Sequence, residues 1–513
     1  MPDLSSEKTD FLARPILGPS LVVLLAICLG LFLIGCAKTE RQVIDRPFIS
    51  ELVEPSTIFG EATVGDNRSK EAIENIQIPE LPHNRPLTLD ECLELALKVS
   101  PAVDSADQGY LGAMWGRWQA ITNFLPTASA SYSVSHRDTP ASLAGGHDVY
   151  SKQVGVTQSV FTGGRNITNY LLSQLGVAAA QIEKVQARED LLLQVKQAYY
   201  SILATEKALA VAKQSVVNLS SHLNVAKNFF DVGMVPRNQV LEAEVELAKA
   251  QLEETTQARN LEVNKSRLNI LLRRAVNYPI KVKDALNHPK FPLSLDYCME
   301  VSLRDNPEVR LGRNQVESGA KNIDLARSEL YPQVTVNYQN SSSGSTPRAH
   351  GGLAGDSSQW AIGAVASFNF WEWGRSKAGV EISKVKLNQA INTLTSLMDN
   401  TKLEVTTNFQ NLVSASRNIV VASKAVESAA EDLRMVTERY QEQVATNTEV
   451  LDAQTRYSQA QYDYFQALYN YNLAWASLER TMGRKVTPAG LTPNGGAPQE
   501  ATAVRPASPP PTL

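Results

Sequence analysis

The chain has 513 residues and a formal net charge of −4, which is enough length for two or three domains or one large elongated domain. The near balance of charge argues against a nucleic-acid-binding protein. The four cysteines show no CxxC or Cys/His zinc spacing, so the sequence predicts neither a disulfide-stapled scaffold nor a metal site.

The N-terminal segment is typical of an export signal. Leu21–Ile34 is an apolar run too short for a comfortable membrane span, and it ends in the sequence Leu-Ile-Gly-Cys at Cys36. This ending resembles the lipobox of bacterial lipoproteins, in which the cysteine is lipidated and begins the mature chain. The resemblance predicts a signal peptide over residues 1–35 and lipidation of Cys36, and Ala37 permits outer-membrane sorting. An uncleaved apolar anchor is the alternative.

Two further segments are predicted to lie outside any packed core. Residues 36–86 are polar and contain five prolines, which predicts an extended arm leading to the first helix. Residues 486–513 contain seven prolines, which predicts a disordered tail.

The region between these segments is a duplication. Matching residues recur at an offset of 206 early in each copy and at an offset of 210 later. The pairs are Thr88–Cys92 with Ser294–Cys298, Pro101 with Pro307, Pro126 with Pro332, Phe161–Arg165 with Trp371–Arg375, and Val240–Ala243 with Val450–Ala453. Because a repeat is usually one structural unit, the sequence predicts one copy over residues 87–285 and a second over residues 286–485.

Each copy is predicted to begin with a helix. In the first copy the helix runs from Leu89 to about Phe124, and Thr88 and Glu91 form a capping box at its start. Cys92 falls on the apolar face of this helix, and Cys298 has the matching place in the second copy. Both thiols are therefore predicted to be buried and without a functional role.

Two segments of alternating residues follow each helix and are predicted as one β-hairpin per copy. They are Ala128–Ser135 with Tyr150–Val160, and Gln333–Asn340 with Trp360–Phe370. Strands of about 9 to 12 residues suit a tilted crossing of a bilayer. Four strands cannot close a barrel, because small barrels need about eight, and lipid excludes open edges. Membrane-spanning strands would therefore require a barrel shared between subunits; soluble hairpins packed on a domain are the alternative.

A long helical hairpin ends each copy. In the second copy, Val380–Met482 lacks glycine and proline, and turn residues occur only near Gln443–Thr448. This pattern predicts a helix of about 65 to 70 residues, a tight reversal, and a helix of about 35 residues capped by Asn447 or Thr448. The first reversal contains Gly233 and Pro236, so the two tips are expected to differ in conformation.

Together these features resemble the TolC-like outer-membrane efflux channels over about residues 87–485. The resemblance rests on the repeated Leu-Asp opening at Leu89 and Leu295, the Phe161–Arg165 joint, the Val-Gly-Met-Val tip and Val450–Ala453. It implies a mostly α-helical fold with membrane β-structure. In such a fold the duplicated long helical hairpins form an α-helical barrel, and a trimer with four strands from each chain shares one transmembrane β-barrel.

The resemblance also implies a function. It implies the outer-membrane exit duct of a tripartite efflux or secretion system, lipid-anchored and extending into the periplasm, which pairs with a periplasmic adaptor and an inner-membrane pump. The tip residues that would face the adaptor are Gly233, Met234, Val235 and Pro236. A pore-less coiled-coil lipoprotein tether or an adaptor is the alternative. The alternation of Trp360–Phe370 argues against a scaffold, and the two hairpins argue against an adaptor.

A gate is implied at the periplasmic end. Glu449 and Asp452 share a helix face and match acids that line the constriction in this family. Three copies would form a ring of carboxylates that attracts cations; an acidic first turn favoured by the helix dipole is the alternative. Tyr440 matches a position whose hydroxyl helps to hold the tunnel closed. Gln239 and Ala445 stand where an acid and a base are typical, which predicts a weaker or differently built lock.

The sequence predicts no enzyme. The six histidines are scattered, none lies at metal-ligand spacing from another, and no phosphate loop or nucleophile motif occurs. We therefore expect no catalytic residue, cofactor or metal.

Overall fold

The computed structural model describes residues 85–136, 138, 147–344, 346–349, 358–487 and 490–491. The chain divides into two compact units, Met1–Gln77 and Ile78–Leu513, and every described residue lies in the second. The predicted signal peptide, the lipidation site Cys36 and nearly all of the predicted arm lie outside the described residues. Within the described ranges, no helix combines the length and the hydropathy that a membrane crossing requires.

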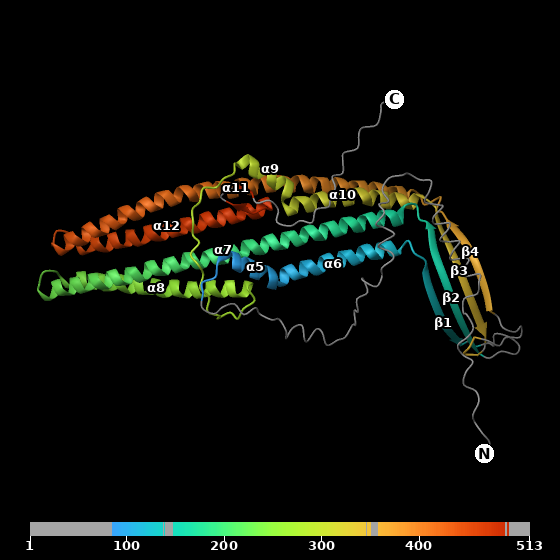
Figure 1. Cartoon of the computed structure of the whole chain (residues 1–513), viewed down its shortest axis with the longest axis horizontal. Helices are drawn as coiled ribbons and strands as arrows, with labels where there is room; N and C mark the ends of the chain where they lie inside the picture. Colours follow the sequence, from blue (N-terminus) through green and yellow to red (C-terminus); the bar gives the residue numbers. More distant parts are fainter. Residues whose placement is uncertain are drawn as a thin grey trace, which may run out of the picture. The chain divides into compact units, whose positions relative to one another are not determined.

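The same order of elements occurs twice along the second unit (Figure 1). Each copy has two short helices, two strands, one very long helix and a helix that returns beside it. The first copy contains α5 (Leu89–Val99), α6 (Pro101–Thr122), β1 (Thr127–His136), β2 (Asp148–Phe161), α7 (Arg165–Asp231) and α8 (Arg237–Leu271). The second contains α9 (Leu295–Asp305), α10 (Pro307–Arg327), η1 (Ser328–Leu330), β3 (Gln333–Gly344), β4 (Ser358–Ser367), α11 (Arg375–Gln441) and α12 (Asn447–Met482).

The first residues of the predicted disordered tail form a short strand pair instead. It consists of β5 (Val486–Thr487) and β6 (Gly490–Leu491), which pair antiparallel. The backbone N–H of Val486 donates to Glu479 Oε1 at 2.7 Å, which ties this segment to the end of α12.

The prediction of one helix over Leu89–Phe124 is wrong, because the segment forms two helices that break at Ser100. Proline has no backbone N–H and disfavours the helical conformation in the residue before it. Ser100 precedes Pro101 and has an extended backbone with ψ of 122°. The pair Asn306 and Pro307 separates α9 from α10 in the same way.

The start of α5 and the burial of the two cysteines agree with the predictions. Both hydrogen bonds of the capping box between Thr88 and Glu91 are present. Cys92 and Cys298 are buried free thiols, and burial raises the pKa of Cys92 to about 12 and that of Cys298 to about 11. Neither thiol is ionised at neutral pH, which is consistent with an apolar packing role.

The two β-hairpins join into one antiparallel sheet with the order β1-β2-β3-β4. β1 pairs with β2 and β3 with β4, as predicted, and the β2–β3 pairing joins the two copies. The strands β1 and β4 are the two edges of the sheet. Every residue of β1 is exposed, and so is nearly every residue of β4. β4 ends at Ser367, so the prediction that Phe368 and Phe370 belong to the strand is wrong.

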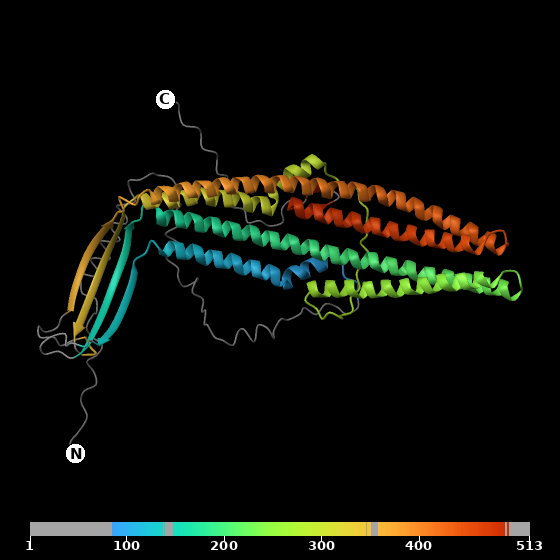
Figure 2. The ribbon, with the colours of Figure 1, turned by 180° about the vertical axis from the view of Figure 1, so that it is seen from behind.

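The long hairpins have the predicted proportions. α7 and α11 each have 67 residues, and their return helices α8 and α12 have 35 and 36 residues. In this unit the sheet lies at one end of the long helices and the two hairpin tips lie at the other (Figure 2). α7 contacts α12 and α10, so the two copies meet along the length of one helix.

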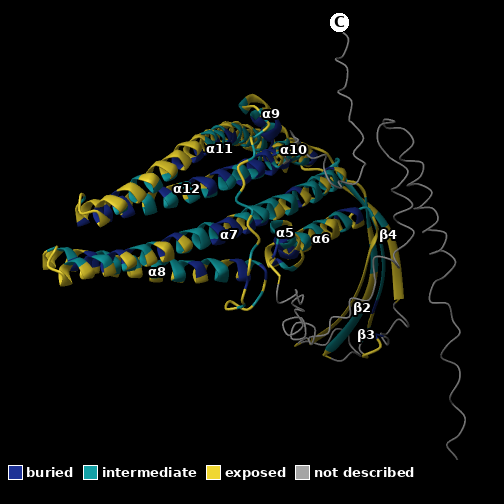
Figure 3. Cartoon of the chain, turned by 60° about the vertical axis from the view of Figure 1, so that its left-hand side comes forward, coloured by how far each residue is buried: buried dark blue, intermediate teal, exposed yellow. Residues whose placement is uncertain are grey.

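Each copy has its own apolar core, where the short helix packs on the long hairpin (Figure 3). Tyr199 and Leu268 are fully buried in the first core, and Tyr471 and Leu478 are nearly or fully buried in the second. Tyr199 donates its hydroxyl hydrogen to the carbonyl of Lys283 at 2.6 Å, which fixes the segment that connects the copies.

Charged side chains tie the two copies together beside these cores. Arg480 on α12 is the centre of this junction: it pairs with Asp190 on α7 at 2.8 Å and with Glu308 on α10 at 2.7 Å. The buried Glu479 pairs with Lys196 on α7. These partly buried pairs are screened by solvent less than surface pairs, and losing one partner would leave a charge uncompensated.

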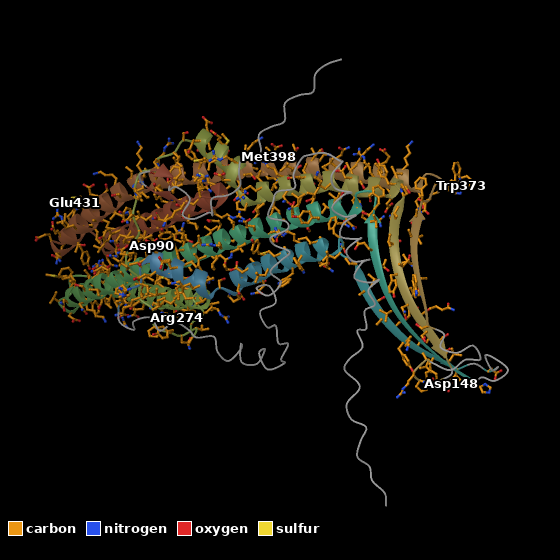
Figure 4. The ribbon with its side chains drawn as sticks, turned by 45° about the vertical axis from the view of Figure 1, so that its right-hand side comes forward. Asp90, Asp148, Arg274, Trp373, Met398 and Glu431 are labelled. Carbon is orange, nitrogen blue, oxygen red and sulfur yellow. The ribbon has the colours of Figure 1, made fainter. Side chains whose placement is uncertain are left out.

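The joints between strand and long helix use the same turn in both copies. Gly163 and Gly164 have positive φ angles of 63° and 89°, and Trp373 and Gly374 have 53° and 81° in the second copy. A tryptophan with positive φ is uncommon. Trp373 is 89% exposed and projects away from the joint (Figure 4).

We predict that Gly163→Ala destabilises the protein more than Gly164→Ala. An alanine at either position adopts a left-handed backbone, which costs about 1 to 2 kcal/mol. A Cβ on Gly163 would also lie 2.6 Å from the carbonyl oxygen of Ser328, whereas a Cβ on Gly164 meets nothing within 4 Å. The clash adds about 1 to 3 kcal/mol. Thermal unfolding followed by circular dichroism measures the difference, and equal shifts of the midpoint would contradict it.

Candidate functional site at the helical tips

Both long hairpins reverse through the same backbone turn. Gly233 in the first tip and Gln443 in the second have positive φ angles of 77° and 60°. The N–H of Gly233 donates to the carbonyl of Phe230 at 2.9 Å, and the N–H of Gln443 donates to that of Tyr440 at 3.0 Å. The expectation that the tips differ in conformation is therefore wrong: different residues build the same turn.

The tips are exposed and touch each other. Gln443 Nε2 lies 2.8 Å from the sulfur of Met234, which joins the two turns. Met234 is 58% exposed, and Val232 and Val444 beside it are 67% and 68% exposed. The residues predicted to face an adaptor, Gly233–Pro236, thus lie on an exposed apolar turn.

The second tip leads into α12 through a capping box. Thr446 is the N-cap, one residue before the predicted cap at Asn447 or Thr448, so that prediction is wrong by one or two residues. The Glu449 carboxylate accepts from the Thr446 N–H at 3.2 Å and from its hydroxyl at 2.9 Å. These hydrogen bonds from Thr446 lower the pKa of Glu449 from its ordinary value. Glu449 therefore has a structural role in the helix start, and it stays ionised.

Asp452 differs from Glu449 in its surroundings. It lies one turn further along α12 and is exposed. No hydrogen bond or ion pair joins its carboxylate to the part of the chain that the structure describes. The structure thus brings the two predicted acids to the first turns of one helix, and among the described residues no other group engages the Asp452 carboxylate.

Tyr440 is buried behind this turn, on α11. Its ring packs against Phe229 and His222 on α7, with centroids 5.7 Å and 4.9 Å apart. Its hydroxyl is buried without a hydrogen-bond partner among the described residues, and so is the side-chain oxygen of Gln239. Burial raises the pKa of Tyr440, so the hydroxyl is a neutral donor.

Sequence reasoning missed the polar contacts between the two hairpins. His222 and Asn218 on α7 bond with Asn447 and Gln454 on α12. These polar residues lie at positions that helical periodicity assigns to the packed face, which was the one available signal. Periodicity does not show which residues they contact. Across the described ranges, no three His, Cys, Asp or Glu side chains come together in a way that could hold a metal ion.

Solved structures share this architecture. The outer-membrane protein VceC of Vibrio cholerae superposes with a TM-score of 0.67 at 16% identity, covering 77% of this chain and 96% of that one. The MtrE outer-membrane channel of Neisseria gonorrhoeae, in its open state, gives 0.65 at 20% identity, covering 77% and 88%. The fold is thus that of the outer-membrane channel proteins that combine long helical hairpins with a small antiparallel sheet.

The sequence itself defines the family. The chain belongs to the outer membrane efflux protein family, whose pattern it matches over residues 93–272 and 299–484. The toluene efflux pump outer membrane protein TtgF of Pseudomonas putida is 22% identical over 269 residues, which is 51% of this chain and 55% of TtgF. The outer membrane efflux protein BepC of Brucella suis is 20% identical over 277 residues, 53% of this chain and 58% of BepC. The chain thus spans little more than half the length of these relatives.

We predict that Gln443→Gly stabilises the second tip. Gln443 holds a left-handed backbone that costs about 1 to 2 kcal/mol for a residue with a Cβ, and glycine avoids this cost. The contact with the Met234 sulfur is lost, but thioether sulfur is a weak acceptor. The midpoint of thermal unfolding should therefore rise.

The matched control is Gly233→Ala, which places a Cβ in the same turn of the first tip and should lower that midpoint. A lower midpoint for Gln443→Gly would show that the Gln443 side chain stabilises the tip more than its backbone conformation strains it.

Proposed function

We propose that the protein is the outer-membrane exit duct of a tripartite efflux or secretion system, and that it acts as a passive trimeric channel. The observation that carries this proposal is the four-stranded sheet with two edges at the end of the long helical hairpins. Three copies of this sheet would supply twelve strands to one closed barrel, which satisfies the edges in lipid. Membership of the outer membrane efflux protein family supports the same function.

The helices would continue the barrel into the periplasm. Each long hairpin starts at a strand, so a closed ring of strands would impose a ring on the helices below it. The hairpin tips would then converge at the periplasmic end, where Gly233–Pro236 forms an exposed apolar surface for a periplasmic adaptor and, through it, an inner-membrane pump. Lipidation of Cys36 would anchor the chain to the outer membrane.

Glu449 and Asp452 are the proposed selectivity gate. Three chains would place six carboxylates around the narrow end of the duct. The ring would attract cations, because charged side chains at a constriction set ion selectivity. Tyr440, whose hydroxyl has no hydrogen-bond partner among the described residues, would contribute a donor behind this ring. The pore-less tether and the adaptor are not favoured, because TtgF and BepC, which match about half of this chain, are outer-membrane efflux proteins.

We predict that Glu449→Gln combined with Asp452→Asn lowers the cation selectivity of single channels in planar lipid bilayers. Glutamine preserves the capping box, since Glu and Gln both serve at this position, so the helix start stays intact. The expected result is a severalfold loss of cation over anion permeability and weaker block by divalent cations.

Asp463→Asn is the control, because Asp463 is an exposed acid on the same helix, about three turns further from the tip. It should leave the selectivity unchanged. Unaltered selectivity in the double variant would remove the gate assignment, and the absence of any conductance from the purified wild-type protein would contradict the channel itself.

A further inference from the structure

The contact between the two hairpins near their tips combines a small apolar cluster around Tyr440 and Phe229 with a set of polar side chains. Asn218 on α7 donates to Gln454 Oε1 on α12 at 3.0 Å, and His222 Nε2 lies 2.7 Å from Asn447 Oδ1. All but Asn218 are buried. Buried hydrogen bonds of this kind specify one geometry, and a partner left without its hydrogen bond is costly, so the contact is sensitive to any change in these side chains.

Asn447 is the centre of this contact. It is the first residue of α12, and only 1% of it is exposed. Its amide nitrogen donates to the carbonyl of Gln239 at 3.3 Å and to the Glu242 carboxylate at 3.1 Å, both on α8. The amide oxygen therefore faces His222, which must be the donor. One side chain thus ties the helix that carries Glu449 and Asp452 to both helices of the first hairpin.

This tie has no counterpart in the first tip. The position that matches Asn447 is Arg237, which is exposed. The position that matches His222 is Asp432, which pairs with Arg456 at 2.9 Å within the second hairpin. Neither His222 nor Asn447 is repeated in the other copy, so the duplication does not account for them. Their contact lies at the tip that bears the proposed gate.

We propose that His222 is a positioning residue for the gate, which holds the start of α12 against the first hairpin through Asn447 and releases it when the imidazole gains a second proton. This inference rests on the proposed function of the tips as a gate. Glu449 and Asp452 lie two and five residues after Asn447 on the same helix, so their position follows that of Asn447.

The direction of the pH effect follows from the surroundings of the imidazole. Burial lowers the pKa of His222 below its ordinary value of 6.5, and the hydrogen bond with Asn447 opposes this only in part. Tyr440 faces it from α11 and the neutral Asn447 from α12, while Glu242 on α8 reaches Asn447 instead of the ring.

Separation of the hairpins would hydrate the imidazole and restore its ordinary pKa. The separated state then binds more protons than the closed state below pH 6.5. The closed contact is therefore fully stabilised above that pH and weakens as the pH falls through it. Glu449 remains charged over this interval, because its pKa is lowered.

The test uses the full-length protein in planar lipid bilayers between about pH 7.5 and about pH 5.5, the interval in which histidine titrates. The wild-type ratio of open to closed channels should rise on acidification by up to about tenfold per pH unit for each coupled histidine. His222→Gln keeps a donor that cannot be charged, so it should stay closed with a flat pH profile. His222→Leu removes the donor and should open at both ends of the range.

His288→Gln is the matched control, because His288 also bonds a side chain, Ser416 Oγ at 2.9 Å, but is exposed and far from the tips. It should retain the wild-type profile. A wild-type pH profile in His222→Gln would overturn the proposal.

A second measurement separates the failure of this proposal from the failure of the channel. If the wild-type protein shows no conductance, hydrogen exchange of the first turns of α12 decides, after correction for the intrinsic pH dependence of exchange. The proposal requires acid to weaken protection in the wild-type protein and not in His222→Gln. Equal effects in both proteins would overturn it.

Discussion

The two edges of the four-stranded sheet are the constraint on which the rest of the structure depends. β2 pairs with β3 inside the chain, which leaves β1 and β4 with one described neighbour each. Such edges are incompatible with lipid, where every backbone N–H and C=O must be paired. Each strand also connects directly to a helix, β1 and β3 after short helices and β2 and β4 before long ones. Any arrangement that closes the sheet therefore also arranges the helices.

The helices are held together differently along their length. At the junction of the copies, Arg480 pairs with acids on α7, α10 and α11, next to two fully formed apolar cores. At the tips, the two hairpins meet through buried hydrogen bonds that centre on Asn447 and through a small apolar cluster that includes Tyr440 and Phe229. Hydrogen bonds contribute about 0.5 to 1.5 kcal/mol each, far less than an apolar core. The middle thus combines large apolar cores with ion pairs, whereas the tips combine a small apolar cluster with buried hydrogen bonds.

Much of this fold follows from the sequence because its signals are repeated and local. The offset of 210 residues between Arg165 and Arg375 also separates the starts of α7 and α11, and the capping residue Thr88 marks the start of α5. The break at Ser100 was missed because Pro101, which disfavours a helical conformation in the residue before it, was not taken as a helix boundary. The shared turn at Gly233 and Gln443 was missed because a glutamine there gives no sign of a left-handed backbone. The contact of His222 with Asn447 spans 225 residues, and no local pattern predicts such a pairing.

The number of chains in one particle tests the central claim most directly, because the claim is that a single sheet is incomplete. Native mass spectrometry of the protein extracted from membranes in mild detergent counts the chains without further assumptions. The account predicts three chains in each particle. A particle that contains one chain, and that still conducts ions in a bilayer, would contradict it.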